Sequence, residues 1–156
     1  MPIHVQADLT IPRPPGHVFA IAAENPARLA EFFTGFKPLI PAILEASMDG
    51  GSGLVPGALR SVRLSDGSRI KERIVAFEAP RVHDYEMAVM NPLQKLLCTN
   101  MVSAWRFEPE GEGTKVTWTY TIHEKPGRAW LARLVASRFQ RAMQRCLENI
   151  ARAATA

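Results

Sequence analysis

Apolar and polar residues alternate along positions 3–11 of the chain. Ile3, Val5, Ala7, Leu9 and Ile11 are apolar, and a polar side chain stands between each pair. This period of two is typical of a strand that buries one face. The pattern predicts a first strand over residues 3–11, which the prolines that follow bring to an end.

Two short helices are predicted after this strand. Pro15 suits the first turn of a helix that continues through Val18, Phe19 and Ile21. Asn25-Pro26 then places a capping residue before a proline in the first helical position, and a second apolar face follows at Leu29, Phe32 and Phe33.

Six further strands are predicted between Gly35 and Ile122. They cover residues 39–48, 58–64, 69–77, 82–89, 98–107 and 114–122. Turn signals lie between most of them, including Ser65-Asp66-Gly67-Ser68, Ala79-Pro80 and the loop 108–114. Because the connections are short and no helix is expected between these strands, the sheet should be antiparallel.

The last part of the chain is expected to form a long amphipathic helix over about residues 126–151. Its apolar residues recur at intervals of three and four, with Phe139 in the middle of the inward stripe. A seven-stranded sheet that curls around one long helix need not fill its own core, since helices can hold the walls apart. The expected fold is therefore α+β, with an internal pocket.

Composition and charge exclude few functions. The 156 residues are 47% hydrophobic and carry a formal charge of +4, which permits an anionic partner without requiring one. The two cysteines, Cys98 and Cys146, have no ligand spacing and are expected to be buried thiols. Neither a secretory signal nor a membrane-spanning run is present, so a cytoplasmic location is expected.

The order of elements and several local motifs resemble the START-like, helix-grip (SRPBCC) superfamily, in particular its polyketide cyclase/dehydrase and lipid-transport branch. The residues that carry the resemblance are Ile11-Pro12 through Phe19, Gly57 through Leu64, Lys71 through Ile74, Gly113 through Trp118, and the final helix. The resemblance implies one START-like ligand-binding domain over residues 1–156. Its fold would be a curved seven-stranded antiparallel sheet around a long C-terminal helix, with two short helices after strand 1.

The stretch 57–74 is also similar to plant abscisic-acid receptors. The counterparts of Val62, Leu64, Glu72, Tyr85 and Met87 line the pocket in that family, which implies a similar placement here. The chain departs from those receptors where they signal, because the minimal turn 65–68 replaces their longer proline-containing gate loop. A hormone-receptor role is therefore not supported, whereas a ligand cavity is.

Arg60 and Glu72 are the most distinctive polar pair in this region. If Gly67 adopts the left-handed conformation in a three-residue hairpin, the two residues become cross-strand partners on the same face as Val62, Leu64 and Ile74. A carboxylate among apolar neighbours is costly unless it is paired. Two interpretations remain open: the pair contacts a ligand, or it is a buried ion pair that only fixes the sheet.

Other chemistry has less support. His83 and Tyr85 share a strand face and could lie near Glu72, which permits a proton-transfer site. The favoured interpretation is that Tyr85 is a pocket wall or core aromatic and that His83 lies near solvent at the start of its strand. Which face of strand 98–107 points inward is left open. The sequence contains no catalytic triad order, zinc motif or cluster of metal ligands, so no catalytic residue is assigned and no metal or cofactor is expected.

Six arginines and Trp130 lie along the terminal helix. A basic amphipathic helix can bind an anionic membrane. Since this apolar stripe is needed to cover the sheet, the arginine face is expected to be solvated, and membrane contact is the less favoured alternative. Nucleic-acid binding is not expected, because the aromatic residues are committed to the interior.

The sequence therefore predicts a protein that binds a small hydrophobic molecule, lipid-like or polyketide-like, in an internal cavity. The alternative is a polyketide cyclase/dehydrase-type enzyme that uses the pocket Glu, Arg and Tyr for acid-base chemistry, and an interaction module with a vestigial pocket is a third class. The oligomeric state is left open. The candidate ligand-binding residues are Arg60, Val62, Leu64, Glu72, Ile74, Tyr85, Met87 and Phe139.

Overall fold

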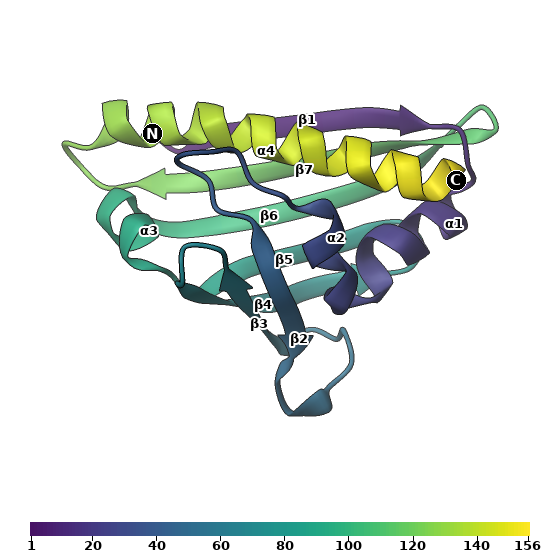
Figure 1. Ribbon diagram of the computed structural model, residues 1–156, viewed down its shortest axis with the longest axis horizontal. Coiled ribbons are helices and arrows are strands. Elements are labelled where there is room, and N and C mark those ends of the chain that lie inside the picture. The colour runs from purple at the N-terminus through teal and green to yellow at the C-terminus, as the bar shows by residue number, and fades with distance from the viewer.

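The computed structural model describes residues 1–156 and contains one antiparallel sheet that curves around a long helix (Figure 1). Seven strands lie in the order β1-β7-β6-β5-β4-β3-β2. Their bounds are β1 Ile3–Ile11, β2 Ile43–Met48, β3 Leu59–Leu64, β4 Arg69–Glu78, β5 Val82–Val89, β6 Cys98–Glu110 and β7 Gly113–Glu124. The predicted helix-grip architecture is thereby confirmed.

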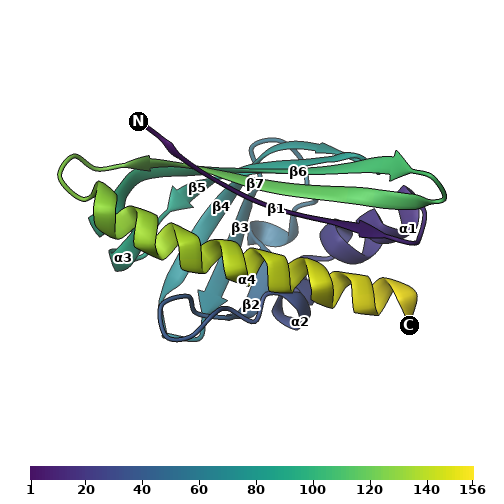
Figure 2. The same cartoon turned by 90° about the horizontal axis from the view of Figure 1, so that it is seen from above.

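The helices lie on the concave side of the sheet. The last helix, α4 (Ala129–Thr155), crosses this side along its whole length, as Figure 2 shows. It starts later than predicted, because Pro126 and Gly127 form a turn, and it ends four residues later, at Thr155. Its glutamines also cover the β1 edge: Gln140 Nε2 donates to Gln6 O at 3.1 Å, and Gln144 Nε2 donates to Asp8 O at 3.0 Å. These bonds occupy backbone acceptors that an edge strand would otherwise expose.

The segment after β1 is helical, as predicted, but it consists of four short pieces. They are α1 (Pro15–Phe19), the π-helix η1 (Ala20–Glu24), the 3-10 helix η2 (Pro26–Arg28) and α2 (Leu29–Phe32). Asn25 caps η2 by accepting a hydrogen bond from Ala27 N at 3.1 Å. A further 3-10 turn, η3 (Asp49–Gly51), follows β2.

Two local predictions were wrong. The expected strand 39–48 begins only at Ile43, because Phe36 and Ile40 bond to each other in a tight bridge and Pro41 follows with no N–H to donate. A helix also lies where none was expected, between β5 and β6: α3 (Pro92–Leu97). Asn91 caps it in a capping box with Gln94, and Pro92 occupies its first turn. The hairpin β5-β6 stays antiparallel around this insertion.

Bulges bend the sheet where the cavity will lie. Register shifts occur between Lys71 and Glu72 and between Ile74 and Ala76 in β4, and a third separates Cys98 from Asn100 in β6. A bulge adds one residue to one strand and increases the local bend and twist. Space remains between this curved face and α4, where residues of both line a cavity.

Candidate ligand cavity

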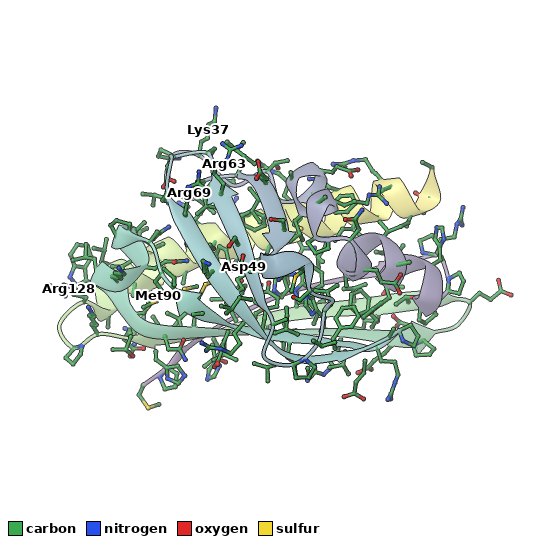
Figure 3. The ribbon with its side chains drawn as sticks, turned by 90° about the horizontal axis from the view of Figure 1, so that it is seen from below. Lys37, Asp49, Arg63, Arg69, Met90 and Arg128 are labelled. Atoms are coloured by element: carbon green, nitrogen blue, oxygen red, sulfur yellow. The ribbon has the colours of Figure 1, made fainter.

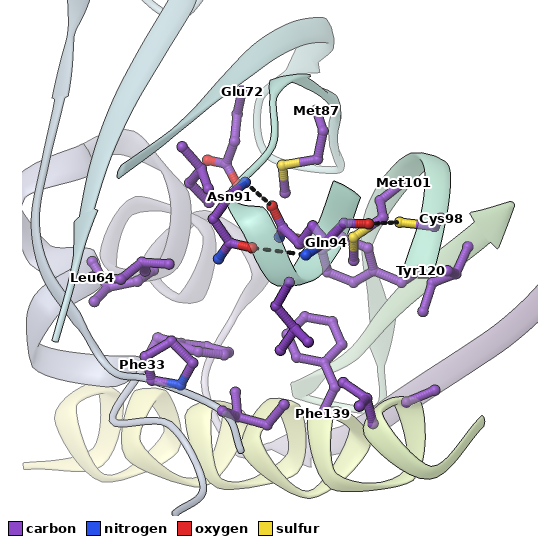
Figure 4. A pocket seen from close by; sticks show the side chains of 18 of the residues that line it. Phe33, Leu64, Glu72, Met87, Asn91, Gln94, Cys98, Met101, Tyr120 and Phe139 are labelled. Carbon is purple, nitrogen blue, oxygen red and sulfur yellow. Dashed lines mark hydrogen bonds between the residues drawn. The ribbon is translucent and has the colours of Figure 1, made fainter. Parts of the chain in front are cut away.

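An apolar cavity of about 130 Å³ lies between the concave face of the sheet, α3, α4 and the segment 29–43. Of its 27 lining residues, 22 are hydrophobic, so its chemistry is set by a few polar groups. Figure 4 shows Phe139 entering from α4 opposite side chains from the sheet, with Asn91 and Gln94 of the α3 segment alongside. A ligand here would be held mainly by removal of apolar surface from water.

The predicted pairing of Arg60 with Glu72 is confirmed. Gly67 has a φ of 88°, and the short turn around it places Arg60 opposite Glu72 across β3 and β4. Arg60 Nε donates to Glu72 Oε1 at 2.8 Å, and the two side chains are only 3% and 7% exposed. Glu72 Oε2 makes no hydrogen bond to the protein and is not fully enclosed, so this oxygen remains available to a ligand or to water.

His83 is buried beside this pair. Arg60 Nη1 lies 3.3 Å from His83 Nε2. Because a guanidinium can only donate, Nε2 must accept, and the ring proton therefore sits on Nδ1, where it has no partner. Burial, and then the charge of Arg60, hold the pKa of His83 well below its usual value. The ring belongs to the wall behind the cavity and not to its lining, so the expectation of a solvent-exposed His83 was wrong.

Two tyrosine hydroxyls meet next to the ion pair. Tyr120 Oη donates to Tyr85 Oη at 3.2 Å, and Trp105 Nε1 lies 3.4 Å from the same Tyr85 oxygen. The guanidinium carbon of Arg60 stands 4.8 Å from the centre of the Tyr85 ring. Burial raises the pKa of both phenols, and the neighbouring charge of Glu72 raises them further. Both tyrosines therefore keep their protons and remain hydrogen-bond donors.

The other polar lining residues are already engaged. Asn91 Oδ1 accepts from Gln94 N at 2.9 Å, and Gln94 Oε1 accepts from Asn91 N at 2.9 Å. Since Arg60 and Glu72 cancel each other's charge, the cavity offers a charged ligand no unpaired counterion. The arrangement suits a neutral molecule with one polar group.

Six of the eight predicted site residues line this cavity: Arg60, Leu64, Glu72, Tyr85, Met87 and Phe139. Val62 and Ile74 share their strand face but are buried in the core outside the lining, at 2% and 1% exposure. Strand β6 turns Met101 and Trp105 inward, which resolves the orientation that the sequence left open. Cys98 and Cys146 are buried thiols, as expected, and burial raises the pKa of each.

Most of the other lining residues were not among the predicted site residues, and three contributors stand out. Tyr120 and Trp118 alternate with polar residues along β7, and this period of two could have placed them inside. The third contributor is α3, whose Leu93, Gln94 and Leu97 line the cavity. Its signal was Asn91-Pro92 followed by Gln94, which is the pattern of a capping box.

Comparison with known proteins identifies the family. Residues 2–155 match the family described as polyketide cyclase / dehydrase and lipid transport. The chain belongs to this family. Similar solved structures include Ara h 8.0201, with a TM-score of 0.75, 21% identity and 99% coverage of both chains. A truncated norcoclaurine synthase from Thalictrum flavum has a TM-score of 0.70 and 15% identity, over 98% of this chain and 93% of that chain.

Bacterial structures of this fold are also similar. An uncharacterised protein from Bacillus thuringiensis has a TM-score of 0.67 and 18% identity, over 99% of this chain and all of the other. No curated protein matches the sequence. At these identities the likenesses show a shared fold, and membership of the polyketide cyclase/dehydrase and lipid-transport family is consistent with binding of a hydrophobic ligand.

Proposed function

We propose that the protein binds a small, neutral, largely apolar molecule in the cavity and orients it through Glu72, Arg60 and the hydroxyls of Tyr85 and Tyr120. The observation that carries the proposal is the composition of the cavity. Its walls are apolar except for one cluster of polar side chains. In this cluster Arg60 and Glu72 neutralise each other, and Glu72 Oε2 is left free. Apolar walls supply affinity, and a few placed polar groups supply orientation.

The size of the cavity limits the ligand. Its volume is about 130 Å³. An engineered apolar cavity of roughly 150 Å³ in another protein binds benzene, so the two volumes are similar. One ring with a hydroxyl or carbonyl group fits this description. A larger lipid-like or polyketide-like molecule would require the segment 36–42 or α3 to move away from α4.

A graded set of probes tests the proposal. Benzene, phenol and benzoate differ only in the polar group, and calorimetric titration gives their affinities. We expect phenol to bind more tightly than benzene, by about 1.5 to 3 kcal/mol for one hydrogen bond to the charged Glu72 carboxylate, and benzoate not to bind. Equal binding of benzoate and phenol would contradict the neutral-ligand assignment.

A pair of variants ties the binding to the cavity. Ala136 lines it and is 5% exposed, whereas its neighbour Ser137 lies on the exposed face of α4. Ala136→Leu should fill the space and abolish phenol binding, and Ser137→Leu should leave binding unchanged.

Native and denaturing mass spectrometry of the purified protein would identify any apolar molecule that it retains from cells.

A second candidate function is a cyclase/dehydrase-type enzyme. The specific observation in its favour is that Tyr85 and Tyr120 stay protonated beside a free carboxylate oxygen of Glu72. The Tyr85 hydroxyl accepts from Tyr120 and keeps its own proton, so it can donate to an oxyanion, and a carboxylate can accept a proton. If a retained ligand loses water on incubation with wild type but not with Tyr120→Phe, the enzyme is favoured. An unchanged ligand mass favours binding.

A further inference from the structure

Large apolar side chains are exposed mainly at one end of the molecule. Nine are exposed in the whole chain, and five of them belong to α3, to the start of α4 or to the N-terminus. These five are Met1, Leu93, Leu96, Trp130 and Leu134, and we refer to this region as the α3/α4 end. Figure 1 shows α3, the start of α4 and the N-terminus at the same end of the fold.

Three contacts join these segments into one region. Arg128 Nη1 donates to Leu96 O at 3.2 Å, and Lys125 N donates to Leu97 O at 2.9 Å. The N-terminal amine of Met1 pairs with Glu124 Oε1 at 3.2 Å. Figure 3 shows Arg128 toward the same end of the fold as Met90, the residue that precedes the α3 cap.

Trp130 is the most unusual residue of the region. It is 71% exposed, whereas Trp105 and Trp118 are 4% and 3% exposed in the core. Trp130 and Leu134 are one helical turn apart, opposite the stripe of α4 that buries Ala132 and Ala136, so neither is needed to cover the sheet. An exposed tryptophan beside aliphatic side chains is typical of surfaces that enter the membrane interface.

Basic residues outnumber acidic ones at this end. Residues 92–97 and 124–134 contain Lys95, Lys125, Arg128 and Arg133, and their only acid, Glu124, already pairs with the N-terminal amine. Exposed apolar side chains surrounded by an excess of cations complement an anionic membrane, which has an apolar interior and negatively charged headgroups. No helix of the structure is long and apolar enough to span a membrane, so contact through this end would be peripheral.

We propose that the α3/α4 end is a docking surface for membranes that contain anionic phospholipid, with Trp130 and its apolar neighbours entering the interface and the basic residues contacting headgroups. The same two helices line the cavity, through Leu93 and Leu97 of α3 and Ala132 and Val135 of α4. When the protein is docked in this way, one wall of its cavity lies next to the bilayer. The docking surface stands on its own and does not depend on which ligand the cavity takes.

Vesicle binding tests this surface directly. The protein is sedimented with vesicles of phosphatidylcholine alone and with vesicles that also contain phosphatidylglycerol. We expect binding only to the second kind, with a loss as salt is raised. Addition of the vesicles that contain phosphatidylglycerol should also shift tryptophan emission to shorter wavelength, because Trp130 is the one tryptophan of the three that is exposed to water. Trp130→Phe should retain binding but lose the shift.

Matched charge variants locate the contact. Lys95→Glu combined with Arg133→Glu should weaken binding more than about twentyfold, since each cation near an anionic surface contributes about fivefold. Arg81→Glu combined with Lys115→Glu makes the same change in net charge at exposed residues beside the last part of β6, whereas α3 precedes its start, and should weaken binding much less. Equal losses in the two pairs would show attraction by net charge alone and would overturn the proposal.

Apolar variants and the oligomeric state complete the test. Trp130→Ala with Leu134→Ala should weaken binding about tenfold or more, whereas Leu44→Ala with Val75→Ala, which truncates apolar side chains exposed elsewhere, should not. No binding to either kind of vesicle would overturn the proposal. So would a dimer in sedimentation velocity that Trp130→Ala converts to a monomer, because the surface would then join two copies of the chain. Phenol affinity, measured without vesicles, reports separately on the cavity.

Discussion

Replacement of Glu72 by glutamine separates the two roles of the buried ion pair. The substitution keeps the shape of the side chain. It leaves Arg60, whose side chain is only 3% exposed, without a counter-charge. Removal of one partner from a buried pair costs about 3 to 5 kcal/mol. The amide oxygen of glutamine can still accept from Arg60 Nε, which offsets about 1 kcal/mol. We therefore expect a loss of about 2 to 4 kcal/mol, or roughly 5 to 15 °C in Tm for a chain of this size.

Urea unfolding of Glu72→Gln and of the double variant Arg60→Met with Glu72→Leu provides the assay. If the cost comes from a stranded charge, the double variant should recover most of the stability, because an apolar pair of similar volume has no charge to desolvate. Phenol affinity of the two variants is measured alongside. A stable Glu72→Gln protein, within about 1 kcal/mol of wild type, would refute the energetic reasoning. A destabilised protein that binds phenol as tightly as wild type would remove Glu72 from the site.

Three further outcomes are expected. The pKa of His83 is lower in the folded than in the unfolded protein, so its contribution to stability is fully present above about pH 6.5 and is lost as the pH falls below that value. His83→Gln should therefore reduce the change in unfolding free energy between pH 7 and 5, as measured by urea unfolding. An unchanged pH dependence would contradict this. Phe139 is half-buried against Phe33 and Tyr120, so Phe139→Ala should cost about 1.5 to 3 kcal/mol and admit larger probes such as naphthalene, as measured by calorimetry. Loss of the α3 cap in Asn91→Ala should cost about 1 kcal/mol and speed amide hydrogen exchange in Pro92–Leu97, while uniform exchange across the chain would argue against a local role for the cap.

Local sequence rules were sufficient where one short-range feature determines the geometry. The cross-strand pairing of Arg60 with Glu72 follows from the length of the turn 65–68 and the positive φ of Gly67, both of which the residues in the turn predict. The long helix follows from a sustained apolar period. The region 90–97 was missed because its helix is too short for periodicity to be visible, so only the capping residues indicate it.

The position of the cavity depends on features that alternation along a strand cannot specify. Val62 and Leu64 point to the same side of β3, as Glu72 and Ile74 do on β4, yet only Leu64 and Glu72 line the space. A period of two identifies the inner face of a strand, but not where the sheet bends away from the helix. That position depends on the bulges in β4 and β6 and on the seating of α4, which join residues far apart in the sequence. The residues that can meet a ligand are therefore those at which the bent sheet and α4 separate, and the inner-face residues beyond that gap only stabilise the core.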